Sequence, residues 1–327
     1  MHKWYGAKIK IMSKLIEDKL DKIPLLKIVV RFFKQIKLPG FEGLSVYDLL
    51  ELYIMGILKG ALTTRASAIA FSFFTAIFPF LLFVIILIPI IPIQDFQNEF
   101  LMFLESVLPP QTSDFFTENI FENIEGRQQA GLLSSVFVLS MLLMANGVNA
   151  VFSGFENSYH EQLTRNVFQQ YFYAFGIALI LAILVLLTVA VFGYFQIYIL
   201  APIYKTYSGG VALADNAEGV GWIVFAKYMF FVLMVYLATA ILYYFGTKEG
   251  RQTRFFSFGA LLTTLLIILT SYLFGVYIDN FSQYNELYGS IGALLILLLY
   301  LWLNSNILLL GYELNATLRR LSKLDIK

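Results

Sequence analysis

The chain is dominated by long apolar stretches separated by shorter polar ones. The first stretch, 66–93, contains 28 residues without a charged side chain, which exceeds the roughly 20 apolar residues needed to cross the hydrocarbon core of a bilayer. Five comparable stretches follow. The six predicted transmembrane helices lie near residues 66–93, 131–153, 169–200, 220–246, 255–279 and 289–313. This pattern predicts an all-α polytopic membrane protein.

Two segments ahead of the first span have helical periodicity but carry charges. Between residues 3 and 37 there are ten Lys and Arg residues but only three acidic residues, and the basic residues alternate with apolar ones. We expect 1–44 to be a basic amphipathic segment on an anionic membrane leaflet; a solvated tail is the alternative. Segment 45–62 is predicted to be an interfacial helix, because three charges would otherwise lie at membrane depth. The membrane domain then covers 45–320, and 321–327 is a short tail.

The basic residues outside the spans are distributed unevenly. Of the 23 Lys and Arg residues, 20 fall on one side of the predicted membrane, in 1–65, 154–168, 247–254 and the tail from residue 314. The opposite side holds a long acidic loop, 94–130. Cytoplasmic loops carry an excess of Lys and Arg. Both termini are therefore predicted to be cytoplasmic.

Composition narrows the classes of function. Hydrophobic residues make up 59% of the chain and charged residues 14%, against roughly 25% charged in a soluble domain. A net charge of +1 argues against a dedicated nucleic-acid binder. The absence of cysteine excludes disulfides and thiolate chemistry, and the two histidines are far apart in the sequence. We therefore predict no catalytic, metal-binding or cofactor-binding residue.

Polar residues inside the spans are the candidates for function, because such residues are costly in lipid. In the first span, Arg65, Ser72, Thr75 and Pro79 share one helical face. Pro79 removes an amide and leaves the Thr75 carbonyl without its helical partner. This span is therefore predicted to be kinked or broken.

The other spans also carry polar stripes, and two interpretations of them remain open. The stripes line an amphiphilic groove, or they form hydrogen bonds that hold helices together. The predicted groove and gate residues of all spans together are Arg65, Ser72, Thr75, Pro79, Asn146, Asn149, Glu156, Asp279, Asn306 and Glu313.

Charged residues concentrate at the predicted membrane boundaries. Arg65, Glu156 and Glu313 fall near the cytoplasmic boundary, whereas Lys227 and Asp279 fall near the outer one. We expect the first three to form a cluster that acts as a gate for a negatively charged headgroup, or as a static pin between helix ends. No carboxylate is predicted alone at the bilayer centre, which argues against a buried proton relay.

Two segments resemble a known family. Residues 65–82 (RASAIAFSFFTAIFPFLL) and 284–315 (YNELYGSIGALLILLLYLWLNSNILLLGYELN) are similar to the N- and C-terminal signatures of the YihY/BrkB family. The second contains a predicted structural motif, which consists of Tyr284, Asn285, Tyr288, Gly289, Ser290 and Gly292. We expect this motif to pack against the outer half of the first span, beside Pro89 and Pro92; the alternative is that Ser290 simply caps the sixth helix.

The resemblance implies a six-helix integral protein of the bacterial inner membrane. Some members of the family have been labelled as ribonuclease BN and others as serum-resistance factors. The nuclease label finds no support in this sequence, because metal-dependent phosphodiester hydrolysis needs clustered His, Asp or Glu ligands.

Our leading hypothesis for function is transporter-like handling of a lipid or other amphiphile through a polar intramembrane groove. A structural scaffold without transport activity is the alternative, and a membrane enzyme is third. The expected partners are membrane lipids and no nucleic acid, and the sequence is compatible with a homo-oligomer.

Overall fold

The computed structural model describes most of the hydrophobic part of the chain. The described residues are 35, 47, 61–87, 130–156, 167–195, 217–247, 250–252, 254–281 and 290–325. The chain divides into two compact units, of which one is Met1–Ala61 with Ala316–Lys327 and the other is Leu62–Asn315. The predicted N-terminal amphipathic helices lie almost entirely outside the described residues. All interactions discussed below lie within Leu62–Asn315.

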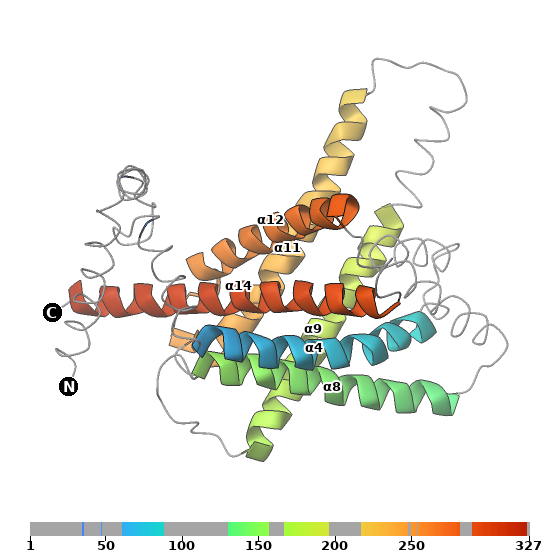
Figure 1. The fold of residues 1–327 in the computed structure, drawn as a ribbon, viewed down its shortest axis with the longest axis horizontal. Helices are drawn as coiled ribbons and strands as arrows, with labels where there is room; N and C mark the ends of the chain where they lie inside the picture. Colours follow the sequence, from blue (N-terminus) through green and yellow to red (C-terminus); the bar gives the residue numbers. More distant parts are fainter. Residues whose placement is uncertain are drawn as a thin grey trace. The chain divides into compact units, whose positions relative to one another are not determined.

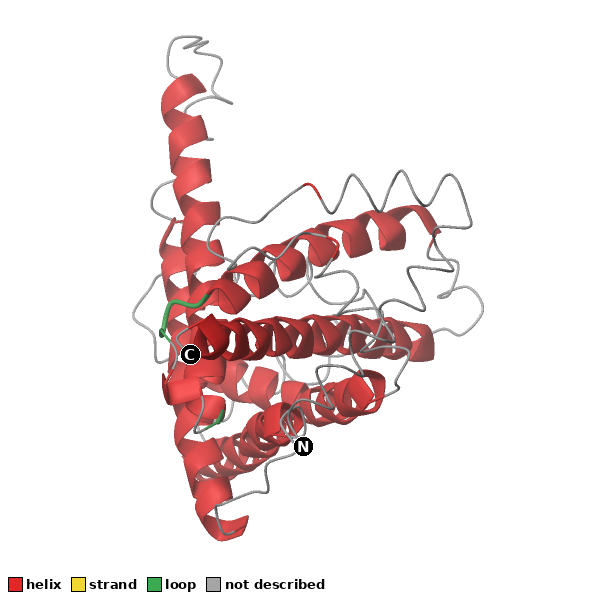
Figure 2. Cartoon of the chain, turned by 90° about the vertical axis from the view of Figure 1, so that its left-hand side faces the viewer, coloured by secondary structure: helices red, strands yellow, loops and turns green. Residues whose placement is uncertain are grey.

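Six α-helices and one short 3-10 helix make up nearly all of the described residues (Figure 1 and Figure 2). They are α4 (Ala61–Leu87), α8 (Ala130–Glu156), α9 (Val167–Tyr194), α11 (Ala217–Gly246), η5 (Gly250–Gln252), α12 (Phe258–Phe281) and α14 (Ser290–Asp325). Five of them, all except α4 and η5, contain a segment long and apolar enough to cross a membrane. The prediction of an all-α membrane protein is confirmed.

Two helices differ in extent from the sequence prediction. α4 includes Arg65 and continues through Pro79 to Leu87 as one curved helix, so it is not broken at the proline (Figure 1). The hydroxyl of Ser140 on α8 donates a hydrogen bond to the carbonyl of Pro79, at 2.6 Å. α14 has 36 residues, about 54 Å at 1.5 Å per residue. It therefore continues well past residue 313 and includes 321–325 of the predicted tail.

The buried core lies at one end of these helices, which we call the Arg65 end. It is formed by the start of α4, the end of α8, the start of α9, the end of α11, the start of α12 and the C-terminal part of α14. Starts and ends alternate along the chain. This alternation is what successive membrane crossings produce, because each helix returns the chain to the side it left.

A seam of small residues on α8 allows α4 to approach closely. Ser140, Gly147 and Gly154 are spaced by seven residues, which is two helical turns. A Cβ atom added to Gly147 would lie 3.2 Å from the ring of Phe73, and one added to Gly154 would lie 3.0 Å from Ile69. Small residues at such interfaces are a common means of packing helices in lipid.

The crossing of α12 and α14 is closer still. A Cβ atom added to Gly259 would overlap the carbonyl oxygen of Gly311. One added to Gly311 would overlap the Thr263 hydroxyl and would lie 2.6 Å from Tyr243 Oη. Glycine is therefore required at both positions for the two backbones to meet.

Candidate functional site

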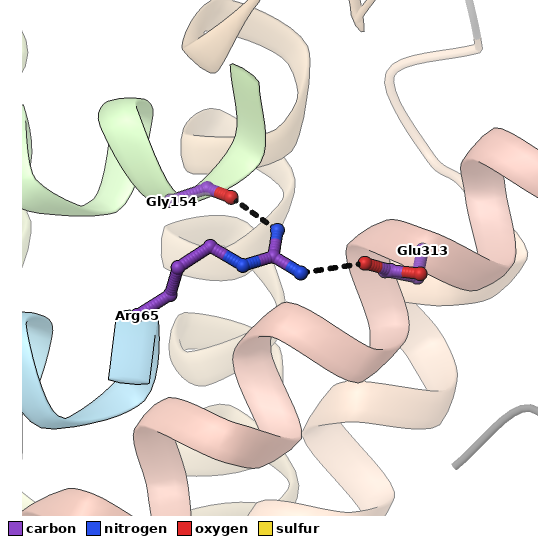
Figure 3. Close-up of polar contacts among 3 residues, drawn as sticks. All are labelled: Arg65, Gly154 and Glu313. Carbon is purple, nitrogen blue, oxygen red and sulfur yellow. Dashed lines mark hydrogen bonds and ion pairs between the residues drawn. The ribbon is translucent and has the colours of Figure 1, made fainter. Parts of the chain in front are cut away.

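Arg65 joins three helices at the Arg65 end (Figure 3). Its Nη1 donates to the carbonyl of Gly154 on α8 at 2.7 Å, and its Nη2 forms an ion pair with Glu313 Oε1 on α14 at 3.0 Å. The side chains of Arg65 and Glu313 are only 12% and 29% exposed. An ion pair held in this way is stronger than a fully exposed one, because less water screens it.

The sequence predicted a cluster of Arg65, Glu156 and Glu313, and the structure brings Arg65 and Glu313 of that set together. On α8, the guanidinium also donates to the main-chain carbonyl of Gly154, two residues before Glu156. Glu156 is the last residue of α8, and its Oε2 is shielded from solvent. A guanidinium presents several N–H donors in a rigid plane, so one arginine can hold a carbonyl and a carboxylate at once.

Three aromatic rings pack together beside this ion pair; we call them the aromatic cluster. Phe155 of α8 stacks on Tyr312 of α14, with ring centroids 4.1 Å apart and planes at 12°. Tyr243 of α11 meets both rings edge-on, at 5.5 Å from Phe155 and 5.8 Å from Tyr312. All three side chains are buried. The cluster therefore closes the centre of the Arg65 end with well-packed apolar surface.

The two tyrosine hydroxyls of the aromatic cluster are hydrogen-bonded. Tyr243 Oη donates to the carbonyl of Leu308 at 2.6 Å and lies 2.6 Å from Thr263 Oγ1. Since a phenol has one proton, Thr263 must be the donor in the second bond. Tyr312 Oη lies 2.6 Å from Thr247 Oγ1 at the end of α11. These bonds tie α11, α12 and α14 together.

Asn315 of α14 caps the start of α12. Its Oδ1 accepts a hydrogen bond from the backbone amide of Gly259 at 2.8 Å, and its Nδ2 donates to Ser257 Oγ at 2.9 Å. Ser257 in turn accepts from the amide of Ala260 at 3.3 Å, as an N-cap residue does. Two otherwise unsatisfied amides are thus satisfied, one of them by a neighbouring helix.

Most of the predicted stripe residues bond to the protein itself. Asn149 Oδ1 accepts from Gln170 Nε2 of α9 at 2.9 Å, and Asn146 Oδ1 accepts from the hydroxyl of Tyr171 at 3.3 Å. Within their own helices, Thr75 donates to the carbonyl of Ser72 at 3.0 Å and Asn306 donates to that of Trp302 at 2.8 Å.

A different polar group lies farther from the Arg65 end, between α12 and α14. Ser271 Oγ lies 2.7 Å from Tyr300 Oη, and Asn304 Nδ2 donates to the carbonyl of Tyr300 at 2.8 Å. Asn304 Oδ1 is buried and has no hydrogen-bond partner among the described residues. We call these three residues the Ser271 group.

Several predicted residues lie outside what the structure describes. These are the side chain of Asp279 in α12, together with Tyr284, Asn285, Tyr288, Gly289, Pro89 and Pro92. The predicted packing of the Tyr284–Gly292 motif against the first span therefore stays a prediction. α14 begins at Ser290, and Gly292 is buried within it. In the described part of the chain, no three His, Asp or Glu side chains are placed to hold a metal ion.

Sequence reasoning missed several contributors to these contacts. The Gly154 carbonyl has no sequence signal, because every residue carries one. The seven-residue spacing of Ser140, Gly147 and Gly154 was such a signal, and it marks the α4–α8 contact. Tyr300 and Asn304 sit one helical turn apart, which places them on one face.

The helices, their apolar surfaces and their polar contacts define an all-helical integral membrane protein. The family described as virulence factor BrkB matches residues 55–326. The chain therefore belongs to the BrkB family.

Individual relatives agree with this assignment. A ribonuclease-like protein of Bacillus subtilis, YfkH, is 26% identical over 263 residues, which cover 80% of this chain and 91% of the relative. A UPF0761 membrane protein of Aggregatibacter aphrophilus is 23% identical over 264 residues, 80% of this chain and 88% of its own. A UPF0761 membrane protein of Xanthomonas oryzae is 42% identical over 60 residues, which cover 18% of this chain and 14% of the relative. No solved structure matches the chain.

Proposed function

We propose that this protein is transporter-like and handles an amphiphile, a lipid or another envelope precursor, in the half of the bundle away from the Arg65 end. The Ser271 group is the observation that supports this proposal. It places polar side chains inside the membrane-spanning segments of α12 and α14, and Asn304 Oδ1 is a buried acceptor with no donor among the described residues.

An unsatisfied buried acceptor costs about 1–3 kcal/mol. Polar residues at membrane depth mark substrate pathways in many membrane proteins. A hydroxyl or ammonium group of a lipid headgroup is a donor that matches Asn304 Oδ1. The acyl chains of the same molecule would lie against exposed apolar side chains of α12, such as Leu269 and Leu273.

The closed Arg65 end supports the same proposal. Arg65, Glu313 and the aromatic cluster hold five helices together there, so an amphiphile would enter from the other half or laterally from the bilayer. A negatively charged headgroup would compete with Glu313 for Arg65, which would make this ion pair a gate. The sequence contains no P-loop for ATP, so movement would be driven by a gradient or would be passive.

A structural scaffold is the second candidate, and a specific observation favours it. The Asn149–Gln170, Ser140–Pro79 and Asn315–Gly259 hydrogen bonds all join different helices. Such bonds are sufficient to explain why these polar residues are present. An enzyme has the least support, because the sequence offers no catalytic dyad or triad.

Reconstitution into liposomes would separate these functions. Transbilayer movement of fluorescent phospholipids with several headgroups would be followed by chemical quenching of the outer leaflet. We expect the protein to accelerate movement and Asn304→Ala to slow it. Ser305→Ala is the matched control, because among the described residues the Ser305 hydroxyl bonds to the carbonyl of Leu301 in its own helix, at 2.7 Å. Movement no faster than in protein-free liposomes would favour the scaffold.

We also infer that the protein lies in a bacterial inner membrane with both termini in the cytoplasm. The uneven distribution of Lys and Arg supports this topology. Reporter fusions at residues 20, 160 and 250 should give cytoplasmic signals, and fusions at 115, 210 and 284 periplasmic ones. A fusion on the opposite side would change the number of spans.

A further inference from the structure

We propose that Arg251 is the centre of a binding site for an anionic phospholipid headgroup at the Arg65 end. Arg251 lies in η5, between α11 and α12, and its side chain is exposed. This site is separate from the Ser271 group and does not depend on transport.

The backbone holds Arg251 in a defined position. Gly250, which precedes it, is buried, and its amide donates to Thr247 Oγ1 at 3.0 Å. A Cβ atom at Gly250 would overlap the carbonyl oxygen of Tyr243 and lie 3.0 Å from that of Tyr244. Only glycine lets η5 approach the end of α11 so closely. The backbone from which the Arg251 side chain extends is therefore held in one position.

The guanidinium is also held in place. Arg251 Nη2 donates to the hydroxyl of Tyr173 on α9 at 2.6 Å. Its Cζ lies 5.2 Å from the centroid of the Tyr173 ring and 6.0 Å from that of Phe245, within the range of cation–π contacts. The Tyr173 hydroxyl uses one of the five N–H donors of the guanidinium. An arginine immobilised in this way loses less entropy when it binds a phosphate in bidentate fashion.

Apolar surface suited to acyl chains adjoins the cation. Neighbouring rings lead from Phe245 through Tyr244 and Phe255 to Phe256, with centroids 5.0–5.6 Å apart at each step. Phe256 is 62% exposed, and Phe172, next to Tyr173, is 79% exposed. Aromatic residues of this kind gather at the membrane–water interface.

A cation beside exposed rings is complementary to a molecule with an anionic head and apolar tails. Basic residues between membrane helices bind anionic lipid headgroups for this reason. Free phosphate would use the cation but not the rings. We therefore assign the site to an anionic phospholipid.

Binding to the full-length protein in neutral detergent tests this site. Native mass spectrometry would compare phosphatidylglycerol with phosphatidylcholine of the same acyl chains. We expect the protein to prefer phosphatidylglycerol and Arg251→Gln to weaken its binding about fivefold. Arg254→Gln is the matched control: it removes an exposed arginine from the same loop, and it should leave the preference nearly unchanged.

Tyr173→Phe provides a milder variant, because it keeps the ring and removes the hydrogen bond to Arg251. It should weaken phosphatidylglycerol binding and leave phosphatidylcholine binding unchanged, and it keeps the test valid if Arg251→Gln does not fold. Equal losses for Arg251→Gln and Arg254→Gln would overturn the proposal, as would equal binding of the two lipids. Displacement of the lipid by inorganic phosphate at the same molar excess would assign the site to free phosphate instead.

Discussion

The two ends of α12 show how differently the two halves of this protein are packed. At the Arg65 end, Gly259 and Thr263 are buried against α14, and atoms of Gly311 leave no room for a side chain at Gly259. Toward the other end, Tyr272 is 70% exposed, and a Cβ atom added to Gly275 would meet no atom within 4 Å. α11 repeats this pattern, with Tyr243 buried near its end and Trp222 72% exposed near its start.

The difference shows what holds membrane helices together. Large apolar side chains such as Leu269, Leu273 and Phe231 are exposed in the loosely packed half, although the helices do touch there, as at Ser271 and Tyr300. In lipid an exposed leucine is already in an apolar solvent, so its burial against another helix gains little free energy. The close glycine contacts of α12 and α14, and most of the hydrogen bonds between helices described above, lie in the packed half. Close backbone approach and polar contacts, rather than hydrophobicity, therefore determine where this bundle is tight.

The largest effect should come from filling the closest contact. Gly311→Leu would insert four carbon atoms where even one overlaps the Thr263 hydroxyl. We expect a loss of stability at or above the upper end of the roughly 1–3 kcal/mol typical of overpacking, measured as unfolding in mixed micelles. Gly275→Leu is the matched control in the loosely packed half and should be close to neutral. Equal losses for the two variants would remove the distinction between the halves.

Breaking the ion pair should have the next largest effect. Arg65→Gln loses both the Glu313 carboxylate and the Gly154 carbonyl as partners, and we expect a loss of about 2 kcal/mol. Glu313→Gln should cost about 1 kcal/mol, because the amide oxygen can still accept from Arg65. Arg254→Gln, which changes an exposed arginine, should have almost no effect on the unfolding free energy.

A double-mutant cycle would show whether Arg65 and Glu313 act on each other. If they do, the Arg65→Gln/Glu313→Gln double variant should be more stable than the sum of the single losses predicts. Strict additivity would mean that the ion pair between Arg65 and Glu313 contributes nothing to stability at this end.

Removing the cap of α12 should have a smaller effect. Asn315→Ala deletes the acceptor for the Gly259 amide, and loss of a helix cap costs about 1 kcal/mol. Asn315→Asp keeps an oxygen at the same place and should recover most of the stability. If Asp recovers nothing, the Asn315 Nδ2 bond to Ser257 is the important one, and the helix start is held by the side-chain contact instead of the amide.

The extent to which sequence predicted this structure follows from the same physics. The long apolar stretches in the sequence located the helices, because a helix needs about 20 apolar residues to cross a bilayer. They also placed Arg65 and Glu313 at a common depth, and the ion pair followed. Rotation about each helix axis was not determined by hydrophobicity, because lipid surrounds every side. For this reason the sequence could not show whether Asn149 lines a groove or bonds to another helix. In the structure it bonds to Gln170, a residue that the sequence analysis did not single out.

The smallest effect should come from the hydrogen bond between Ser271 and Tyr300, in the loosely packed half. Hydrogen bonds between membrane helices contribute about 0.6 kcal/mol on average. Tyr300→Phe leaves the second bond of the Ser271 hydroxyl, to the carbonyl of Ile267 at 2.7 Å, in place, whereas Ser271→Ala removes both bonds. Ser271→Ala and Tyr300→Phe should each cost about this amount, and the double variant should cost little more than either alone. Thr264→Ala is the matched control, because the Thr264 hydroxyl bonds to the carbonyl of Ala260 in its own helix. A loss for Ser271→Ala as large as that for Arg65→Gln would show that polar contacts also hold this half tightly, and the contrast between the two halves would then rest on glycine packing alone.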